Sequence, residues 1–333
     1  MDQRIINLFD EYTHAPLTRQ EFLARLLKLA GSTAVAAAAL AVLEPGYAHA
    51  ATVPASAADL VEKNVSWPGA ERATVRGYLV HPKGRRKRGA VVVVHENRGL
   101  TPHIKDVTRR VAQAGYVALG VDALSVLGGT SANEDEGRAL IGKLDKAQNL
   151  ANYLAALTYL RGRPDCNGRT GCVGFCWGGA LANQLALHDP QLNAAVAYYG
   201  VQPEATADLS RIKARLLLHY AGLDERVNAG KDAYEAALKA AGVPFEQYVY
   251  AGVNHAFNND ASPARYNAEA AQLAWERTLQ LFREALGSRA EASSGLAVVV
   301  GMQIRCRCLA APLAPEAARQ FALSCSYSTF NKL

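Results

Sequence analysis

Strand-like runs alternate with helix-like segments through the middle of this 333-residue chain. The runs cover residues 75–80, 90–95, 116–121, 171–175, 194–199, 214–220 and 245–250, and the helical segments cover 103–114, 143–160, 178–188, 229–241 and 264–286. This alternation predicts βαβ units on a mostly parallel sheet. We therefore expect an α/β fold of three layers, with helices on both faces of one sheet. The last helix is expected to face the sheet with Leu273, Trp275, Leu279, Leu281 and Phe282.

One predicted strand ends in a glycine-flanked turn with a thiol at its apex. Residues 174–178 read Gly-Phe-Cys-Trp-Gly, which is the nucleophile-elbow pattern G-x-S-x-G with cysteine in place of serine. Glycines flank such a nucleophile because the strand-to-helix turn leaves no room for side chains. The pattern predicts Cys176 as the nucleophile and the N–H of Trp177 as a donor to an oxyanion. A buried structural cysteine is the alternative interpretation.

Two further residues follow Cys176 in the order that a hydrolytic triad requires. In α/β-hydrolases the nucleophile is followed along the chain by an acid and then by a histidine. Asp224 follows a predicted strand and a glycine turn, and His255 follows the next predicted strand. Taken singly, Asp224 is typical of a turn or helix cap, Glu225 competes with it, and His255 is typical of a loop. Their joint order favours a triad, whereas His219 is expected in the core.

Four separated motifs resemble the dienelactone hydrolase family of α/β-hydrolases. They lie at residues 90–100, 174–179, 221–224 and 252–257, and the resemblance covers about residues 55–287. It implies an α/β-hydrolase fold and a carboxylic ester hydrolase of the carboxymethylenebutenolidase type. It also implies a triad of Cys176, Asp224 and His255 that works through a thioester acyl-enzyme. The alternative is a non-catalytic protein that binds a ligand or partner in the same cleft.

The resemblance also assigns roles to residues after the strand at 90–95. It places Glu96 beside the thiol, where a carboxylate would raise the thiol pKa and so modulate Cys176, and it makes the N–H of Asn97 the second oxyanion donor. Family members that act on dienelactone hold its carboxylate with arginines, one of them shortly after the catalytic histidine. No arginine stands between His255 and residue 265, so Arg98 and Arg138 are the candidates for substrate binding. A small ester or lactone is the expected substrate class.

The first 50 residues have the features of an export signal. A mostly apolar stretch covers residues 26–43, and Ala48-His49-Ala50 fits an A-x-A cleavage site. Residues 17–23 resemble a twin-arginine signal in which Gln20 replaces the second arginine. We expect residues 1–50 to be an export signal or an N-terminal anchor, and the hydrolase domain to cover 51–287 in the periplasm. A cytoplasmic protein with an alanine-rich helix is the alternative.

The remaining features exclude several other functions. The net charge of +6 is spread along the chain, and the basic run at 83–89 is expected to be an exposed turn rather than a nucleic-acid site. The sequence has no persuasive metal-ligand spacing and no phosphate-binding glycine loop, and the hydrolytic chemistry needs no cofactor. A membrane contact is expected only through an uncleaved N-terminal segment. Residues 288–333 depart from the family pattern, and we expect this tail to be poorly ordered.

The catalytic thiol must remain free of disulfides if it is exported, because oxidising compartments favour them. Cys172 is expected inside a strand and Cys166 in the loop before it, so a bond from either to an elbow thiol would be strained. We therefore expect Cys176 to be a free thiol.

Overall fold

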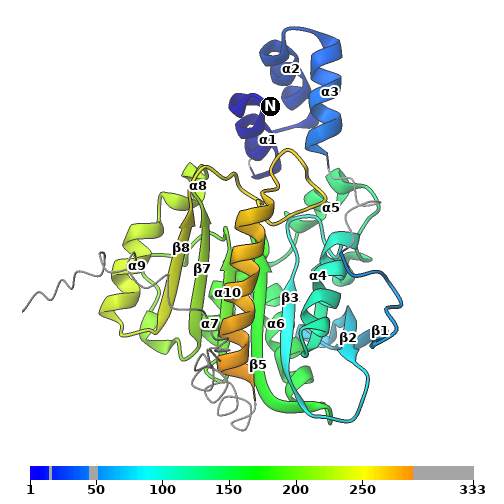
Figure 1. Ribbon diagram of the computed structural model, residues 1–333, viewed down its shortest axis with the longest axis vertical. Coiled ribbons are helices and arrows are strands. Elements are labelled where there is room, and N and C mark those ends of the chain that lie inside the picture. Colours follow the sequence, from blue (N-terminus) through cyan, green and yellow to red (C-terminus); the bar gives the residue numbers. More distant parts are fainter. Residues whose placement is uncertain (15–16, 45–51, 288–333) are drawn as a thin grey trace, which may run out of the picture. The chain divides into compact units, whose positions relative to one another are not determined.

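The computed structural model describes residues 1–14, 17–44 and 52–287, and the tail at 288–333 lies outside these residues. Its centre is an eight-stranded sheet in the order β1-β2-β4-β3-β5-β6-β7-β8 (Figure 1). The strands are β1 (Leu60–Pro68), β2 (Thr74–Pro82), β3 (Arg88–Val94), β4 (Val117–Asp122), β5 (Cys166–Phe175), β6 (Ala194–Tyr198), β7 (Arg215–Ala221) and β8 (Phe245–Tyr250). Strand β2 pairs antiparallel with β1 and β4, and all other pairs are parallel.

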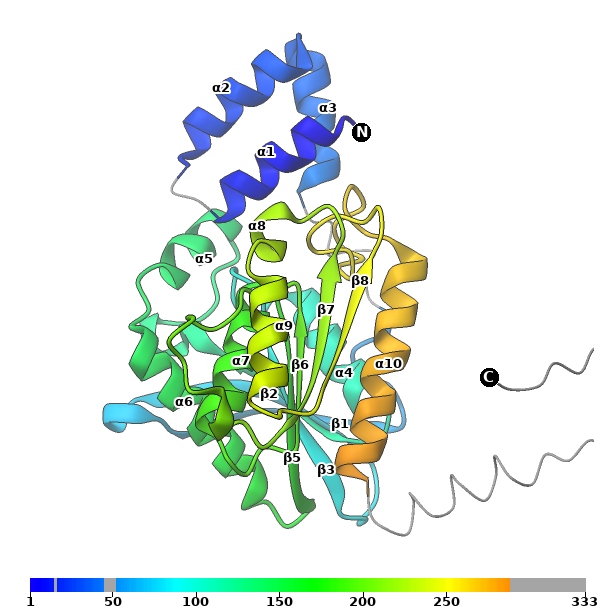
Figure 2. The ribbon, with the colours of Figure 1, turned by 90° about the vertical axis from the view of Figure 1, so that its left-hand side faces the viewer.

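Helices cover both faces of this sheet, as Figure 2 shows. After β3 the described helices are α4 (Pro102–Gln113), α5 (Glu134–Ile141), α6 (Lys146–Arg161), α7 (Trp177–His188), α8 (Glu225–Asn228), α9 (Lys231–Ala240) and α10 (Ala268–Leu286). The core has one apolar layer with α6, α7 and α9 and another with α4 and α10. Strand β3 shows the alternation that divides them: Val92 belongs to the first layer, and Val91 and Val93 belong to the second. The predicted three-layer α/β fold is confirmed.

All seven predicted strands are present, within a few residues of their expected ends. Strand β1 was not predicted, because its edge position leaves most of its side chains partly or fully exposed and removes the apolar signal. On α10 the prediction is right for Leu281 and Phe282, which are buried, but wrong for Leu273, which is 40% exposed. The buried residues on this part of α10 are the small Ala270 and Ala274, rather than Leu273 as predicted.

Two other sequence predictions concern single segments. In the basic run at 83–89, residues 83–87 connect β2 to β3 and are exposed, as expected of a turn, whereas residues 88 and 89 begin β3. His219 is fully buried in the core, where its ring nitrogens face the hydroxyls of Tyr250 and Thr278.

The N-terminal segment forms three helices: α1 (Gln3–His14), α2 (Arg19–Ala30) and α3 (Thr33–Leu43). The apolar stretch at 26–43 is interrupted because Gly31 ends α2 at a φ of 73° and Ser32 caps α3. Phe9, Phe22 and other apolar side chains of the three helices share a buried cluster. Among the described helices, none alone has the length and apolarity to cross a membrane; α2 and α3 meet that test only as a pair bent by 119°.

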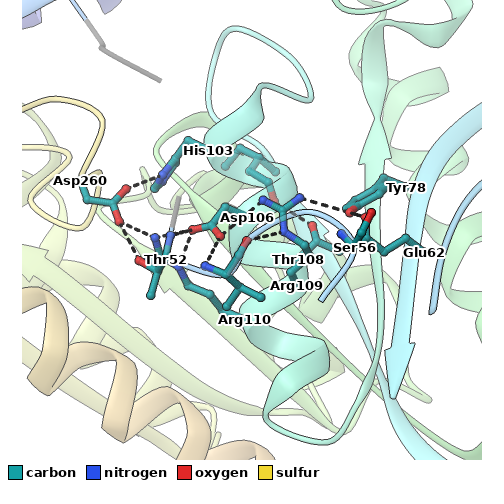
Figure 3. Close-up of polar contacts among 12 residues, drawn as sticks. Thr52, Ser56, Glu62, Tyr78, His103, Asp106, Thr108, Arg109, Arg110 and Asp260 are labelled. Carbon is teal, nitrogen blue, oxygen red and sulfur yellow. Dashed lines mark hydrogen bonds and ion pairs between the residues drawn. The ribbon is translucent and has the colours of Figure 1, made fainter. Parts of the chain in front are cut away.

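A buried polar network holds the loop at 256–267, which follows His255 (Figure 3). Asp106 of α4 accepts hydrogen bonds from the N–H groups of Thr52 and Val53 at 3.1 and 2.8 Å and from Arg110 Nε at 2.7 Å. Arg110 also binds Asp260 in the loop, and His103 Nδ1 lies 3.0 Å from the Asp260 carboxylate. The network therefore joins α4, the segment before β1 and the loop.

The charge state of Asp260 makes this network sensitive to acid. Burial alone would raise the pKa of Asp260, but the hydrogen bond from His103 and the positive charge of Arg110 hold that pKa below its ordinary value. Because the pKa of Asp260 is lower in the folded state, its charge contributes fully to the free energy of unfolding at any pH above the pKa of an unfolded aspartate. This contribution is lost as the pH falls through the pKa that Asp260 has in the folded protein.

We predict that Asp106→Asn lowers the free energy of unfolding by about 3 kcal/mol, because it removes a buried negative charge and leaves Arg109 and Arg110 without their shared partner. Urea unfolding followed by circular dichroism measures the change. Asp59→Asn alters an exposed aspartate and serves as the control. An unchanged unfolding midpoint for Asp106→Asn would show that the network does not stabilise the fold.

Candidate active site

Cys176 lies in the turn between β5 and α7, in a backbone conformation that few residues adopt. Its φ and ψ are 58° and −114°, which is strained for a residue with a side chain. The N–H of Cys176 donates to the Tyr198 carbonyl at the end of β6, and its carbonyl accepts from Gly179 at 3.0 Å. These bonds hold the thiol at the carboxyl end of the parallel strands, where α/β proteins bind their ligands.

The glycines around Cys176 are required by close backbone contacts. A Cβ atom on Gly174 would lie 1.9 Å from the Gly178 carbonyl oxygen, and one on Gly178 would lie 2.5 Å from the carbonyl oxygens of Val94 and His95. The first turn of α7 therefore packs directly on the end of β3. This geometry is that of the predicted elbow.

Asp224 and His255 come together as the sequence predicts. Asp224 Oδ2 lies 2.5 Å from His255 Nδ1, and both side chains are buried. Asp224 Oδ1 also accepts the Val227 N–H at 3.1 Å, so this aspartate is a helix cap as well as the partner of the imidazole. Glu225, the competing acid, is exposed.

The expected hydrogen bond from Cys176 to His255 is not formed in this structure. His255 Nε2 is buried, and within the part of the chain that is described it has no hydrogen-bond partner. Cys176 Sγ instead lies 3.0 Å from Nε2 of His14, the last residue of α1. One donor atom from each of His14, Cys176 and His255 falls within 4.8 Å of the others. Catalytic contacts in an unliganded enzyme are often long, so this spacing is compatible with a triad.

His14 was missed by the sequence analysis because it lies 162 residues before Cys176 in a segment interpreted as an export signal. Burial alone would lower the pKa of His14, but the adjacent Cys176 and a hydrogen bond to Asp10 raise it above its ordinary value. These contacts favour the positively charged form of His14. Only a pairing signal between distant residues could have revealed this contact.

The residues after β3 lie next to the elbow, where Gly178 packs against the His95 carbonyl. Glu96 is buried and accepts a hydrogen bond from Asn259 Nδ2 at 2.8 Å. Asn97 is also buried, and its side-chain amide donates to the Thr13 carbonyl at 2.6 Å, which ties this loop to the end of α1. Trp177, the other expected oxyanion donor, is the first residue of α7, where backbone N–H groups have no acceptor within the helix.

The three arginines around the site have different surroundings. Arg98 is buried and forms an ion pair with Glu134 at 3.0 Å. Arg138 donates to the Tyr12 carbonyl and lies 3.9 Å from the centre of the Tyr12 ring, so it contacts α1. Arg265 is buried and reaches the site even though it is ten residues beyond His255 along the chain. Burial lowers the pKa of its guanidinium.

Two pockets meet at His14. The first, of about 660 Å³, is lined by Cys176, Trp177, Asn97 and Arg138 among others. The second, of about 480 Å³, is lined by Asp224, His255, Arg265 and residues of α1. His14 and Arg226 line both.

Tyr199 adds an unexpected polar group to the larger pocket. Its hydroxyl is buried, and among the described residues it has no hydrogen-bond partner. Burial, with the negative charges of Glu96 and Cys176, raises the pKa of Tyr199 well above its ordinary value. The hydroxyl therefore keeps its proton and is available as a donor to a bound ligand.

The cysteines near the elbow are separate. Cys166, Cys172 and Cys176 all carry free thiols. Burial raises the pKa of Cys166 and Cys172, which disfavours their thiolates. The other three cysteines of the sequence, at positions 306, 308 and 325, lie outside the described residues.

We predict that Gly178→Ala lowers the free energy of unfolding by about 3 kcal/mol, because the added methyl group would push α7 away from the end of β3. Thermal and urea unfolding measure the loss. Gly162→Ala is the matched control, since its Cβ would have no neighbour closer than 3.7 Å. Equal stability of the two variants would mean that the elbow tolerates a side chain at residue 178.

Comparisons with known proteins agree with this geometry. The model of the "Dienelactone hydrolase family" matches residues 75–286. A provisionally named carboxymethylenebutenolidase from Methylorubrum extorquens is 32% identical over 247 residues, which cover 70% of this chain and 84% of that protein. A solved structure of a provisionally named dienelactone hydrolase from Klebsiella pneumoniae is 28% identical, with a TM-score of 0.59 over 67% of this chain and 98% of the other.

A more distant solved structure shares the fold alone. It is an esterase from Pyrobaculum calidifontis, 16% identical, with a TM-score of 0.55 over 83% of this chain and 97% of that protein. The family match covers more than half of the chain and includes the elbow, Asp224 and His255. The chain belongs to the dienelactone hydrolase family of α/β-hydrolases.

Proposed function

We propose that this protein hydrolyses a small ester or lactone with Cys176 as nucleophile, His255 as base and Asp224 as the residue that orients His255. The observation that carries the proposal is the strained elbow at Cys176 together with the 2.5 Å contact between Asp224 and His255. Family membership supports hydrolysis of a small-molecule substrate. The ester class and the thiol mechanism are our inference.

The chemistry begins with ionisation of the thiol. Asp224 accepts the proton on His255 Nδ1, which leaves Nε2 free to take the proton of Cys176. The thiolate then attacks the carbonyl carbon of the substrate, and the imidazolium returns its proton to the departing alkoxide. Water, activated by the same imidazole, hydrolyses the thioester and regenerates the thiol.

The N–H groups of Trp177 and Asn97 are the proposed oxyanion donors. Both residues line the pocket that holds Cys176, and Trp177 is the first residue of α7. Such donors stabilise negative charge that develops only in the transition state. The pocket of about 660 Å³ suits a small acyl group, and Arg138 at its wall is the proposed contact for a polar substituent on the substrate.

Glu96 is proposed to modulate the thiol. A buried carboxylate close to a thiolate disfavours its negative charge, and the hydrogen bond from Asn259 keeps the Glu96 side chain in place. Rearrangement of Glu96 on substrate binding would then favour ionisation of Cys176.

The N-terminal helices are relevant to the cellular location of the protein. Export through the twin-arginine-like signal would place it in the periplasm, and cleavage after Ala50 would remove α1 from the site. The contacts of Asn97 with Thr13 and of Cys176 with His14 support retention of α1 in the folded enzyme. We propose that this segment is retained, and intact mass of protein from its native compartment tests this point.

We predict that Cys176→Ala lowers kcat/KM by at least about 1,000-fold on any ester or lactone that the wild type hydrolyses, because the covalent route is lost. The assay is a panel of small lactones and short aryl esters. Cys166→Ala, which removes another buried free thiol, is the control and is expected to keep the wild-type rate. Equal rates for wild type and Cys176→Ala would refute the thiol mechanism.

We predict that Glu96→Gln speeds the alkylation of Cys176 by iodoacetamide several-fold at neutral pH, since removal of the carboxylate charge favours the thiolate. Peptide mass spectrometry measures the rate at Cys176. Glu269→Gln alters an exposed carboxylate and is the control. An alkylation rate and a turnover rate that both stay at wild-type values would remove Glu96 from the mechanism.

A further inference from the structure

Three potential metal ligands from distant parts of the chain meet at the elbow. His14 comes from the end of α1, Cys176 from the β5–α7 turn and His255 from the loop after β8. Their donor atoms lie within 4.8 Å of one another. The sequence shows no metal-binding spacing because the three residues are separated by 162 and 79 positions along the chain. The fold alone creates the cluster.

Both imidazoles are held so that the same nitrogen faces the thiol. His14 Nδ1 lies 2.8 Å from the Asp10 carbonyl and 3.2 Å from the Asp10 carboxylate, and His255 Nδ1 lies 2.5 Å from Asp224. In the neutral imidazole an oxygen acceptor at Nδ1 places the proton there, so that Nε2 carries the lone pair. Histidines that bind metals almost always have such a partner on the other nitrogen.

His255 supplies an independent observation. The residue is only 4% exposed, and its Nε2 atom is buried and, within the described residues, has no hydrogen-bond partner. Buried polar atoms normally have a partner, so an atom that lacks one requires an explanation such as a bound ion. The unpartnered lone pair belongs to the same cluster as Cys176 Sγ and His14.

We propose that His14 Nε2, Cys176 Sγ and His255 Nε2 bind one zinc-class divalent cation. One thiolate and two imidazoles are ligands that suit Zn²⁺ and disfavour Mg²⁺ and Ca²⁺, which prefer oxygen. Tetrahedral bond lengths of about 2.1 Å to nitrogen and 2.3 Å to sulfur place the donors about 3.4 to 3.6 Å apart. Metal binding would therefore widen the 3.0 Å separation of His14 Nε2 and Cys176 Sγ slightly, and would draw in donors that lie as much as 4.8 Å apart by about 1 Å.

The charges around the cluster fit a cation. Binding requires the Cys176 thiolate, so the thiol proton is released to solvent as the metal–sulfur bond forms. The metal and the thiolate then carry a net charge of +1, and the two nearby carboxylates of Asp10 and Asp224 offset it electrostatically. The fourth position of the metal would open toward a pocket that His14 lines.

Metal binding has a consequence that rests on the proposed function. It engages the sulfur lone pair of the nucleophile and the Nε2 atom of the base, so the metal-bound enzyme cannot start the thiol mechanism. The site therefore makes the hydrolase sensitive to zinc. Because His14 is the only ligand outside the proposed triad, α1 is the element that confers this sensitivity.

The test measures metal binding directly in the full-length chain, with residues 1–50 verified by intact mass. Zn²⁺ is titrated calorimetrically into chelator-treated protein, and Co²⁺ is added in parallel to detect a thiolate-to-cobalt charge-transfer band. We expect one Zn²⁺ per chain, at least 100-fold weaker binding in His14→Ala, and no charge-transfer band in Cys176→Ala. His188→Ala, which alters a histidine on α7 outside the cluster, is the matched control and is expected to bind Zn²⁺ like the wild type.

Binding of equal strength in wild type and His14→Ala, or no stoichiometric binding in the wild type, would overturn the proposal. Loss of residues 1–50 from the native protein would overturn it as well. The binding measurements use no substrate, so they decide the metal site even if no ester is hydrolysed. The hydrolysis rate of each variant is then measured with and without Zn²⁺, which tests the link to catalysis. We expect His14→Ala to need at least 100-fold more Zn²⁺ than the wild type for half inhibition.

Discussion

The close approach of α7 to the end of β3 is the constraint on which the site depends. Gly178 leaves no room for a side chain against the carbonyls of Val94 and His95, and Gly174 leaves none against Gly178. This contact fixes the reversal of the chain after β5 and holds Cys176 at a positive φ. The thiol thereby faces the loops at the carboxyl ends of the strands, which also carry Asp224 and His255. The strain at residue 176 is offset by the packing of the sheet and helices around it.

The second determinant is the contact of α1 with this same point. His14 reaches Cys176, Thr13 accepts a hydrogen bond from Asn97, and Tyr12 contacts Arg138. The N-terminal segment is thus part of the site in this structure, because it lines both pockets and supplies the His14 imidazole beside Cys176 and His255. The loop that carries His255 is held through Asp260 and the polar network of α4, and also by a hydrogen bond from Gln3 of α1 to Asn254. Contacts from α1 and α4 together therefore define the position of the two histidines around the thiol.

The sequence predicted the parts of the molecule that leave a local pattern. The central parallel strands are apolar on both faces, so they were recognisable, and the elbow, Asp224 and His255 each followed a predicted strand. Edge strand β1 and helix α5 lack such a pattern and were missed. The role of His14 could not be predicted, since its contact with Cys176 depends on how α1 packs. Leu273 was misplaced because helical periodicity does not reveal that small alanines allow the closest approach to a sheet.

Covalent acylation of Cys176 distinguishes the proposed thiol mechanism from other routes, and trapping of the acyl-enzyme measures it. A slowly hydrolysed aryl ester from the active panel is mixed with the full-length protein, quenched in acid and analysed by peptide mass spectrometry. We expect one acyl group on the peptide that contains Cys176, and its release by hydroxylamine as expected of a thioester. Turnover of the ester with the acyl group on another residue, or with no acylation at early times, would contradict the thiol mechanism.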